Sequence, residues 1–443
     1  MLPDPIDGAV AVVRAPIAAA FALTFVLVAP LAAQGDDARV KASIDRLTPD
    51  LLAVRHDIHA NPELGNHETR TAALVATRLR TLGLEVRTGV AKTGVVGILR
   101  GGRPGPVIAI RADMDALPVV EQTDLPFAST IRTEYDGGMV GVAHVCGHDI
   151  HVTVALGTAA VLAEMKPRLA GTVIFIFQPA EEGPPVGEEG GAPLMLKEGV
   201  FPPDLTPVAI FALHSDAGLD VGTAGYTPGP AMAAAQAWRA TLIGRTAHGA
   251  APQESIDPVV MASQAVLALQ TIRSRNLSPF TSSVVTVGII RGGERRNIIP
   301  EKVELAGTIR TFSPAVLDTI KRRMREILDG VAISAGGRAE LAFDESSPVL
   351  VNDSLLAHQM RPALERVLGR DKVRIVQERM GAEDFAYFAE RYPSFYFRLG
   401  TRDPVKGSGG VHTPTFRGDD SAIAVGVRAM TAVVLERLGS SSR

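Results

Sequence analysis

The positions of the hydrophobic residues predict alternating helices and strands in the first half of the chain. Between residues 37 and 80, apolar residues recur three and four positions apart, a spacing that predicts helix. Uninterrupted apolar runs of the kind that form buried strands follow at 95–99, 107–110, 172–177 and 208–213. A helical pattern at 152–165 separates the second run from the third. The alternation favours an α/β fold whose sheet is covered on both faces.

The segment from residue 231 to residue 345 has a different order of elements. Strand patterns at 237–244, 282–293, 301–312 and 338–344 are interrupted by two predicted helices. These helices begin at Pro258 and Pro314, each after a residue suited to cap a helix N-terminus. The resulting β-α-β-β-α-β order is that of a ferredoxin-like α+β sandwich. We therefore expect this small domain to be inserted into a large α/β domain formed by 34–230 and 346–443.

The first 33 residues are unlike the rest of the chain. After Arg14 comes "APIAAAFALTFVLVAPLAAQG", which has a short apolar core and small residues at its end. This layout is typical of a secretory signal peptide, with cleavage after Ala33, and it predicts a periplasmic or secreted protein. A retained membrane anchor is the alternative. We expect no stable membrane partner unless the segment is retained.

Charge and histidine content direct attention to one short segment. The formal net charge of −3 gives no basic field for nucleic acid, so we expect no nucleic-acid partner. The chain has ten histidines, and three of them (His144, His148 and His151) lie within eight positions around Cys146, its only cysteine. A single cysteine forms no internal disulfide. Here it is a buried hydrophobe, a nucleophile or a metal ligand.

Polar motifs follow the predicted strands. They are "RADMDALP" (111–118), "CGHDIH" (146–151), "FQPAEEG" (177–183), "ALHSD" (212–216) and, nearer the C-terminus, "GGVHTP" (409–414). In open α/β sheets ligands bind beyond the carboxyl ends of strands, so these side chains are expected to converge. Cysteine, histidine and carboxylate together fit a transition-metal site. His144 and His151 are expected to be hydrogen-bonding or structural groups rather than ligands.

The adjacent carboxylates Glu181 and Glu182 fit the same hypothesis. One of them can bind metal while the other takes a proton from an attacking water. A nucleophilic Cys146 would require one basic histidine and an oxyanion hole, but neither the glutamate pair nor a distant histidine such as His214. An inert buried cysteine remains a further alternative.

These motifs resemble those of the dimetal amidohydrolases and carboxypeptidases that include aminoacylase, hippurate hydrolase and the auxin-conjugate (indole-acetyl-amino acid) amidohydrolases. The resemblance spans nearly all of the chain after the first 33 residues. It implies a catalytic α/β domain with a mixed sheet, of the phosphorylase/hydrolase-like, zinc-exopeptidase type. It also implies that the inserted domain serves as a lid and for dimerisation. Two divalent metal ions per subunit are implied, with Zn or Mn expected and Ni or Co as alternatives.

The resemblance also implies roles for individual residues. The implied metal ligands are Cys146, His148, Glu182, His214 and His412, and the thiolate of Cys146 is implied to bridge the two ions. Glu181 matches the general base, and Asp113 matches an acid that orients a ligand. His248 matches a histidine that stabilises the oxyanion in the partner subunit's site. Asn297 and Arg310 match residues that hold the substrate carboxylate, and Glu383 matches one that lines the substrate side.

The activity implied is hydrolysis of the amide bond in N-acyl amino acids or related small amides by an activated water. The substrate is then a small molecule with a free carboxylate, and the protein is a homodimer. A carboxypeptidase or dipeptidase of the same family is the first alternative. A periplasmic binding protein without catalysis is the second, and the presence of Glu181 argues against it. For Arg310, an exposed strand charge without function is the alternative.

Overall fold

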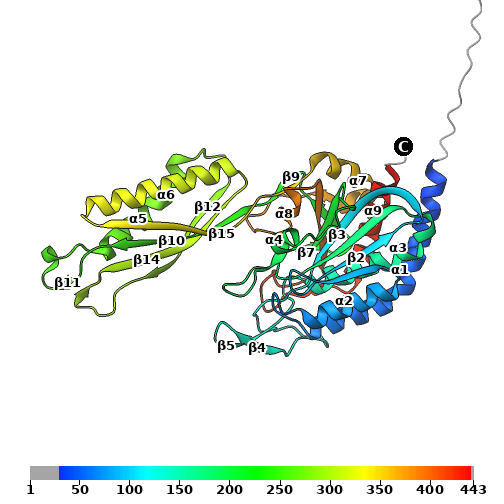
Figure 1. The fold of residues 1–443 in the computed structure, drawn as a ribbon, viewed down its shortest axis with the longest axis horizontal. Coiled ribbons are helices and arrows are strands. Elements are labelled where there is room, and N and C mark those ends of the chain that lie inside the picture. Colours follow the sequence, from blue (N-terminus) through cyan, green and yellow to red (C-terminus); the bar gives the residue numbers. More distant parts are fainter. Residues whose placement is uncertain (1–28, 441–443) are drawn as a thin grey trace, which may run out of the picture.

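The computed structural model describes residues 29–440 and shows a broad α/β lobe from which a narrower lobe projects (Figure 1). The predicted signal peptide at 1–33 lies outside the described residues, except for its last five positions, which belong to the first helix. Within the described part of the chain, no helix has both the length and the apolar character needed to cross a membrane.

In residues 29–440 the large lobe contains an eight-stranded mixed sheet in the order β1-β2-β6-β3-β7-β18-β8-β17. Its strands are β1 (Glu85–Val90), β2 (Gly94–Arg100), β3 (Arg103–Asp113), β6 (Ala170–Gln178), β7 (Ile210–Asp220), β8 (Ala224–Tyr226), β17 (Val373–Ile375) and β18 (Ser394–Arg402). The central strands β6, β3, β7 and β18 run parallel, whereas β1 and β2 are antiparallel additions at one side. The four apolar runs in the sequence thus form β2, β3, β6 and β7, which confirms the predicted α/β class.

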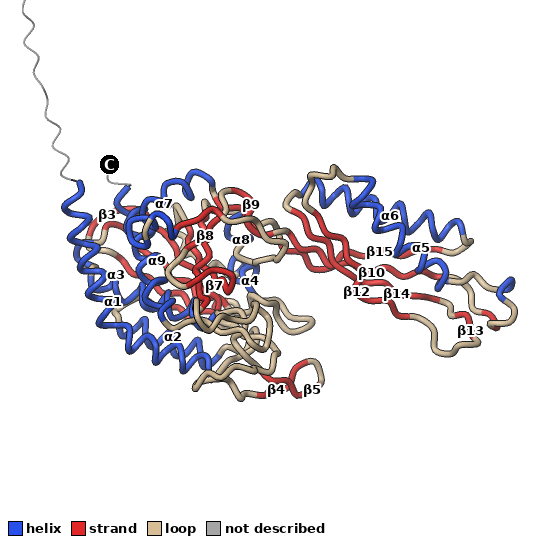
Figure 2. Tube along the Cα trace, turned by 180° about the vertical axis from the view of Figure 1, so that it is seen from behind, coloured by secondary structure: helices blue, strands red, loops and turns tan. Residues whose placement is uncertain are grey.

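Helices cover both faces of this sheet (Figures 1 and 2). One face packs against α1 (Ala29–Ala60), α2 (Thr69–Thr81), α3 (His148–Glu164), α7 (Ser354–Leu368) and α9 (Ser421–Ser440), and the other against α4 (Gly191–Lys197) and α8 (Ala386–Ala389). Because successive strand residues point to opposite faces, Phe175 and Phe177 enter the first core while Ile174 and Ile176 enter the second. The sheet is therefore apolar on both sides, as its continuous hydrophobic strands require.

The projecting lobe contains a four-stranded antiparallel sheet, in the order β12-β14-β10-β15 within the described residues. Its strands are β10 (Ala234–Ile243), β12 (Ser283–Arg291), β14 (Lys302–Thr311) and β15 (Arg338–Ser347), and its helices are α5 (Pro258–Thr271) and α6 (Pro314–Ser334). The side chains of Asp257 and Ser313 cap the two helices by accepting backbone N–H groups, as the sequence predicted. Trp238 is buried between the sheet and these helices. The inserted ferredoxin-like sandwich is confirmed.

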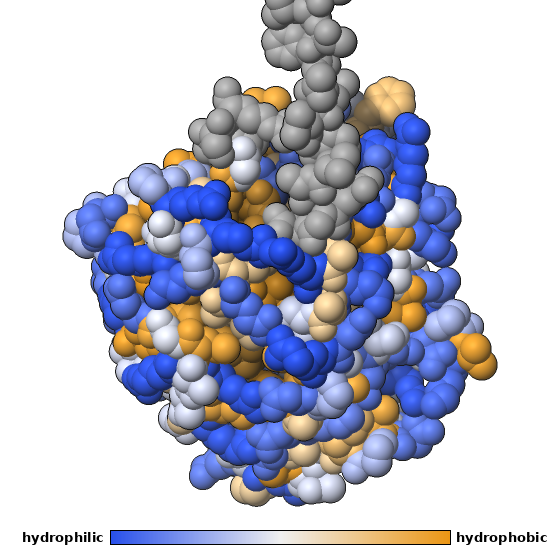
Figure 3. Space-filling view, turned by 90° about the vertical axis from the view of Figure 1, so that its right-hand side faces the viewer, coloured by the Kyte–Doolittle hydropathy of each residue, from blue (hydrophilic) through white to orange (hydrophobic). Residues whose placement is uncertain are grey.

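Shorter elements complete the chain. A two-stranded ribbon, β11 (Ala247–His248) with β13 (Ile298–Ile299), lies at the far tip of the inserted lobe (Figures 1 and 2). The large lobe also carries the hairpin β4 (Arg132–Tyr135) and β5 (Gly138–Gly141) and the pair β9 (Gly229–Met232) and β16 (Leu350–Asn352). The face of the molecule shown in Figure 3 is mostly hydrophilic, and its apolar residues form small separate patches.

Candidate metal centre

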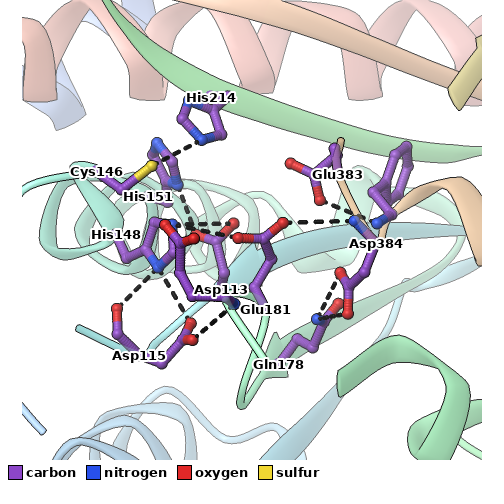
Figure 4. A network of polar contacts seen from close by, with 12 residues as sticks. Asp113, Asp115, Cys146, His148, His151, Gln178, Glu181, His214, Glu383 and Asp384 are labelled. Atoms are coloured by element: carbon purple, nitrogen blue, oxygen red, sulfur yellow. Dashed lines mark hydrogen bonds and ion pairs between the residues drawn. The ribbon is translucent and has the colours of Figure 1, made fainter. Parts of the chain in front are cut away.

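The predicted ligands converge at the carboxyl ends of the central strands, and Figure 4 shows three of them, Cys146, His148 and His214. Cys146 and His148 lie where the preceding loop enters α3, and His214 lies on β7. Glu182 follows β6, and His412 lies in the loop before α9. Gly147 between the first two ligands has φ 89°, and a Cβ there would lie 2.3 Å from the Ser215 Oγ atom, so glycine alone fits this turn.

Two groups of donor atoms share the thiol of Cys146. Its Sγ lies 3.4 Å from Nε2 of His214, and with His148 these atoms lie within 4.8 Å of one another. The same thiol forms a second group with Glu182 and His412, again within 4.8 Å. Nε2 of His412 lies 2.9 Å from Oε1 of Glu182. A sulfur atom common to two groups is the arrangement that a bridging ligand requires.

The electrostatics of this cluster favour a cation. Burial raises the pKa of the Cys146 thiol well above its usual range, and the carboxylates of Glu182 and Glu181 raise it further. Burial lowers the pKa of His214 well below its usual range, so this imidazole is neutral. A divalent ion stabilises a thiolate and neighbouring carboxylates, and neutral imidazole is the form that binds metal. The donor set therefore fits transition-metal ions.

One ring nitrogen of His148 has the surroundings expected of a metal ligand. Its Nε2 atom is buried and has no hydrogen-bond partner among the described residues. Its Nδ1 atom lies 2.8 Å from the carbonyl of Asp115 and 3.1 Å from that residue's Oδ1. Burial alone would lower the pKa of His148, but Asp113 and Asp115 outweigh it and raise the value to about 10. Metal binding at Nε2 would thus displace a proton while Nδ1 keeps its bond to Asp115.

Asp115 is a site residue that the sequence analysis did not single out. Besides contacting His148, its Oδ2 accepts the backbone N–H of Glu182 at 2.9 Å. One carboxylate therefore holds two of the predicted ligands. The motif "RADMDALP" contains both aspartates, but only the fold shows that the second one reaches Nδ1 of His148.

Asp113, at the end of β3, has different partners. Its Oδ1 accepts from Nδ1 of His151 at 2.5 Å, and its Oδ2 accepts from Nη1 of Arg111 at 2.6 Å. Burial alone would raise the pKa of Asp113, but His148, Arg111 and His151 hold it well below its usual range. Oδ2 of Asp113 also lies 3.8 Å from Nε2 of His148, so this anion faces the ligand without bonding to it.

The two remaining histidines of the cluster differ from the ligands. His151 accepts the backbone N–H of Ser215 at Nε2, 2.7 Å away, so its proton lies on Nδ1, which donates to Asp113. Both ring nitrogens of His151 are therefore used within the protein. His144 is buried, and neither of its ring nitrogens has a hydrogen-bond partner among the described residues.

Glu181 faces the cluster from the side opposite Cys146 (Figure 4). Its Oε2 lies 3.8 Å from Nε2 of His148, and its Oε1 accepts a long hydrogen bond of 3.4 Å from the backbone N–H of Asp384. Burial raises the pKa of Glu181 well above its usual range, and the carboxylates of Glu383 and Glu182 raise it further. A carboxylate with a raised pKa is a better proton acceptor, which suits a general base.

A buried arginine holds the acidic side of the site in place. Arg111 donates to Oδ2 of Asp113, to Oε1 of Glu383 at 2.9 Å and to Oδ1 of Asp384 at 2.8 Å. Glu383 is buried, and it lines the cavity that opens onto the cluster. Arg111 was assigned no role from the sequence, because Glu383 and Asp384 lie far from it in the chain.

The three predicted residues of the inserted lobe do not join this cluster within one chain. His248 and Asn297 lie at the far tip, beside the ribbon of β11 and β13 (Figures 1 and 2). Arg310 is half-buried on β14 beside Ala235, near the end of the lobe that joins the large one. Nδ1 of His248 accepts the backbone N–H of Ala250 at 3.0 Å, so its Nε2 carries the proton.

Two hollows adjoin the candidate centre. One, of about 170 Å³, is lined by Cys146, Glu181, Glu182, His214, Glu383 and His412, and also by Met232, Arg379, Tyr396 and Arg398. The other, of about 300 Å³, lies on the far side of Glu182 and is bordered by Asp115, His67 and the β4–β5 hairpin. The donor atoms are therefore reached from space large enough for a small organic molecule.

Comparison with known proteins agrees with this geometry. Residues 109–436 match peptidase family M20/M25/M40. The chain is 36% identical to the Arabidopsis thaliana protein named IAA-amino acid hydrolase ILR1-like 2, over 88% of this chain and 85% of that protein. It is 37% identical to the N-acetylcysteine deacetylase of Bacillus subtilis, over 88% of this chain and 97% of the relative.

A solved structure extends the comparison to the fold. A crystal structure from Bacillus subtilis, described as a dinuclear metal-binding peptidase from the M20 family, superposes with a TM-score of 0.76 and 32% identity. The superposition covers 89% of this chain and 99% of that one. Together with the donor groups around Cys146, this supports a site for two metal ions. The chain therefore belongs to peptidase family M20/M25/M40 and is a metal-dependent amidohydrolase.

Proposed function

We propose that the protein hydrolyses the amide bond of N-acyl amino acids. The observation that carries this proposal is the buried thiol of Cys146, shared by two groups of donor atoms with Glu181 close by. The names of two relatives, an IAA-amino acid hydrolase and an N-acetylcysteine deacetylase, support this class of substrate. Peptide hydrolysis is the second candidate, because the family and the Bacillus subtilis structure are described as peptidases.

The ions would be held by Cys146, His148, Glu182, His214 and His412, with Cys146 common to both. When bound, such ions lower the pKa of a water and polarise a carbonyl oxygen. Zn or Mn fits a mixed sulfur, nitrogen and oxygen donor set, and Ni or Co are the alternatives.

Glu181 is the proton carrier in this proposal. One of its carboxylate oxygens takes the proton from the water that attacks the scissile carbonyl. The same carboxylate then gives that proton to the leaving nitrogen, so that the amine departs neutral. Its burial beside Glu383 supports this role, because both raise the pKa of Glu181. A higher pKa makes the carboxylate a stronger base toward the attacking water. Asp113 is proposed to fix His151 and to face Nε2 of His148.

The inserted lobe is proposed to complete the site from a second copy of the chain. His248 lies at a tip directed away from its own large lobe, and the proton on its Nε2 suits donation to an oxyanion. The edge strand β12 exposes Val284, Ile289 and Ile290, which supports pairing with a twofold mate. Asn297 and Arg310 are proposed to hold the substrate carboxylate, like the residues that they match in the amidohydrolase family.

The remaining parts of the proposal concern organisation and location. We assign residues 34–230 and 346–443 to the catalytic domain and 231–345 to the dimerisation domain. Residues 1–33 are assigned to a signal peptide, so that the mature protein is periplasmic or secreted. The composition of this leader supports the assignment.

The test uses two neighbouring glutamates. Purified protein loaded with each of Zn, Mn, Ni and Co is assayed on N-acetyl and N-benzoyl amino acids and on dipeptides. Glu181→Gln should keep its metal and lose turnover by several orders of magnitude, whereas Glu182→Gln should lose metal affinity. Elemental analysis measures the second effect independently of activity. Equal metal content and equal loss of activity in both variants would refute the division of roles, and faster hydrolysis of dipeptides would favour the second candidate.

A further inference from the structure

Two arginines line the cavity of about 170 Å³ opposite the predicted metal ligands, and the sequence analysis assigned a role to neither. Arg398 lies on β18 and Arg379 on the segment before α8. The pairing of β18 with β7 places Arg398 directly beside His214, and neighbouring strands lie about 4.8 Å apart. The guanidinium groups therefore border the same space as the reacting groups.

A single carboxylate lies beside both arginines. Asp216 is buried, and its Oδ2 accepts from Nη2 of Arg379 at 2.6 Å while lying 4.0 Å from Nη1 of Arg398. Its Oδ1 is occupied by the backbone N–H of Gly218 at 2.8 Å. One negative charge thus faces two positive charges, and a purely structural pair would need only one of them. Both guanidinium groups line the cavity.

The buried guanidinium of Arg398 destabilises the fold unless a ligand accepts its hydrogen bonds. Its side chain is only 6% exposed, and within residues 29–440 its guanidinium makes one hydrogen bond, from Nη2 to the carbonyl of Gln377 at 3.1 Å. A buried guanidinium with unused donors is destabilising unless an acceptor reaches it. Arg379 is 43% exposed, so the pair has one arginine inside the cavity and one at its open side.

The position of Arg379 is fixed by its backbone. Its N–H donates to the carbonyl of Ala231, and its carbonyl accepts from the N–H of Ala233, each at 3.0 Å. These residues lead directly into β10, the first strand of the inserted lobe. The subsite therefore lies where the two lobes join, within reach of a substrate enclosed between them.

We propose that Arg379 and Arg398 form a subsite that binds a carboxylate of the substrate. The proposal rests on the proposed function and narrows it to acids whose carboxylate lies near the scissile amide. A planar guanidinium fork matches a carboxylate in two parallel hydrogen bonds. A doubly charged phosphate fits less well, because Glu181, Glu182 and Glu383 line the same cavity.

The α-carboxylate is already assigned to Asn297 and Arg310, so the acid bound here is a second carboxylate, from the side chain of the amino acid or from the acyl group. Three pairs of substrates separate these sources, and the first pair, which changes only the α-carboxylate, is the control. N-acetylglutamine is compared with its α-amide, N-acetylglutamate with N-acetylglutamine, and N-succinylalanine with its succinamoyl counterpart. Each pair exchanges one carboxylate for an amide of nearly the same shape.

The variants are Arg398→Met and Arg379→Met, with Arg398→Lys as the conservative change. Arg402→Met is the matched control, because Arg402 also lies on β18 and is paired with an aspartate, Asp220, but does not line the cavity. In the wild type, kcat/KM should favour the acid of the second or the third pair by about tenfold or more. The ratio of kcat/KM for the acid to kcat/KM for the amide should fall toward one in Arg398→Met and Arg379→Met. It should be partly retained in Arg398→Lys and unchanged in Arg402→Met.

Binding is measured separately from turnover. The same ligand pairs are titrated by calorimetry into a Glu181→Gln protein with and without Arg398→Met, with thermal unfolding as the control for folding. If the wild type hydrolyses no N-acyl amino acid, the proposed function fails, while the titration still tests the subsite. The subsite is overturned if the acid-to-amide preference is absent from the second and third pairs, or if both Met variants retain it there.

Discussion

Asp115→Ala is expected to weaken metal binding although Asp115 is not one of the predicted ligands. In the structure this side chain contacts Nδ1 of His148 at 3.1 Å and accepts the backbone N–H of Glu182 at 2.9 Å. Both contacts orient residues that supply donor atoms. The carbonyl of Asp115 remains 2.8 Å from Nδ1 of His148 in the variant, so the orientation of the imidazole is only partly lost.

The size of the effect follows from those contacts. Loss of a hydrogen-bond partner behind a metal-ligating histidine typically costs about 10- to 100-fold in metal affinity. The retained carbonyl contact places the effect on His148 toward the lower end of that range. The unpaired N–H of Glu182 adds to it, since that group is left without its acceptor. We expect about 30-fold in total, or about 2 kcal/mol of metal-binding free energy.

The assay is a chelator titration followed by elemental analysis of the protein. Glu134→Ala is the matched control, because Glu134 borders the larger hollow together with Asp115 but is exposed and contacts no predicted ligand. Circular dichroism of the metal-free proteins measures any change in folding. If Asp115→Ala released its metal at the same chelator concentration as the wild type, the proposed orientation of His148 and Glu182 would be refuted.

Two further predictions concern pH and assembly. Burial alone would lower the pKa of His59, but Asp149 and Glu121 outweigh it and raise the value to about 9, so the protonated form stabilises the fold. This stabilisation, about 3 kcal/mol, is fully present below pH 6.5 and is lost as pH rises to 9. Urea unfolding at both ends of this range should show that His59→Gln lowers the pH dependence by about this amount. Part of the dependence remains because the pKa of His148 is also raised, to about 10. An unchanged dependence would contradict the assignment. Mixing inactive His248→Ala and Glu181→Gln chains under subunit exchange should restore activity if His248 acts in the partner's site, whereas exchange without recovery would exclude this.

The fold was predictable wherever one local pattern determines one element. Continuous apolar runs identified four strands of the main sheet because both faces of those strands are buried. Asp257 and Ser313 marked the helix starts of the inserted lobe because a cap is a local interaction between neighbouring residues. Sheet order is not local, and the place of β18 beside β7 could not be read from the sequence.

The same distinction explains the site. Cys146 and His148 were conspicuous because scarce residue types lie close together in the sequence. Arg398 was missed because its relation to His214 arises only from the pairing of two strands that are far apart in the chain. Asp115 was overlooked because its role depends on the path of the chain after β3. Residues defined by long-range pairing therefore required the structure.

The central claim is that the thiol of Cys146 is common to two metal ions. Elemental analysis of Cys146→Ala, purified beside the wild type with the same added metal, tests this most directly. Thermal unfolding confirms that the variant is folded, and His67→Ala, at the rim of the larger hollow, serves as a control. The account predicts two ions per chain in the wild type and the control, and less than one in Cys146→Ala, because both sites lose a ligand. A folded Cys146→Ala protein that retained two ions with normal turnover would contradict it.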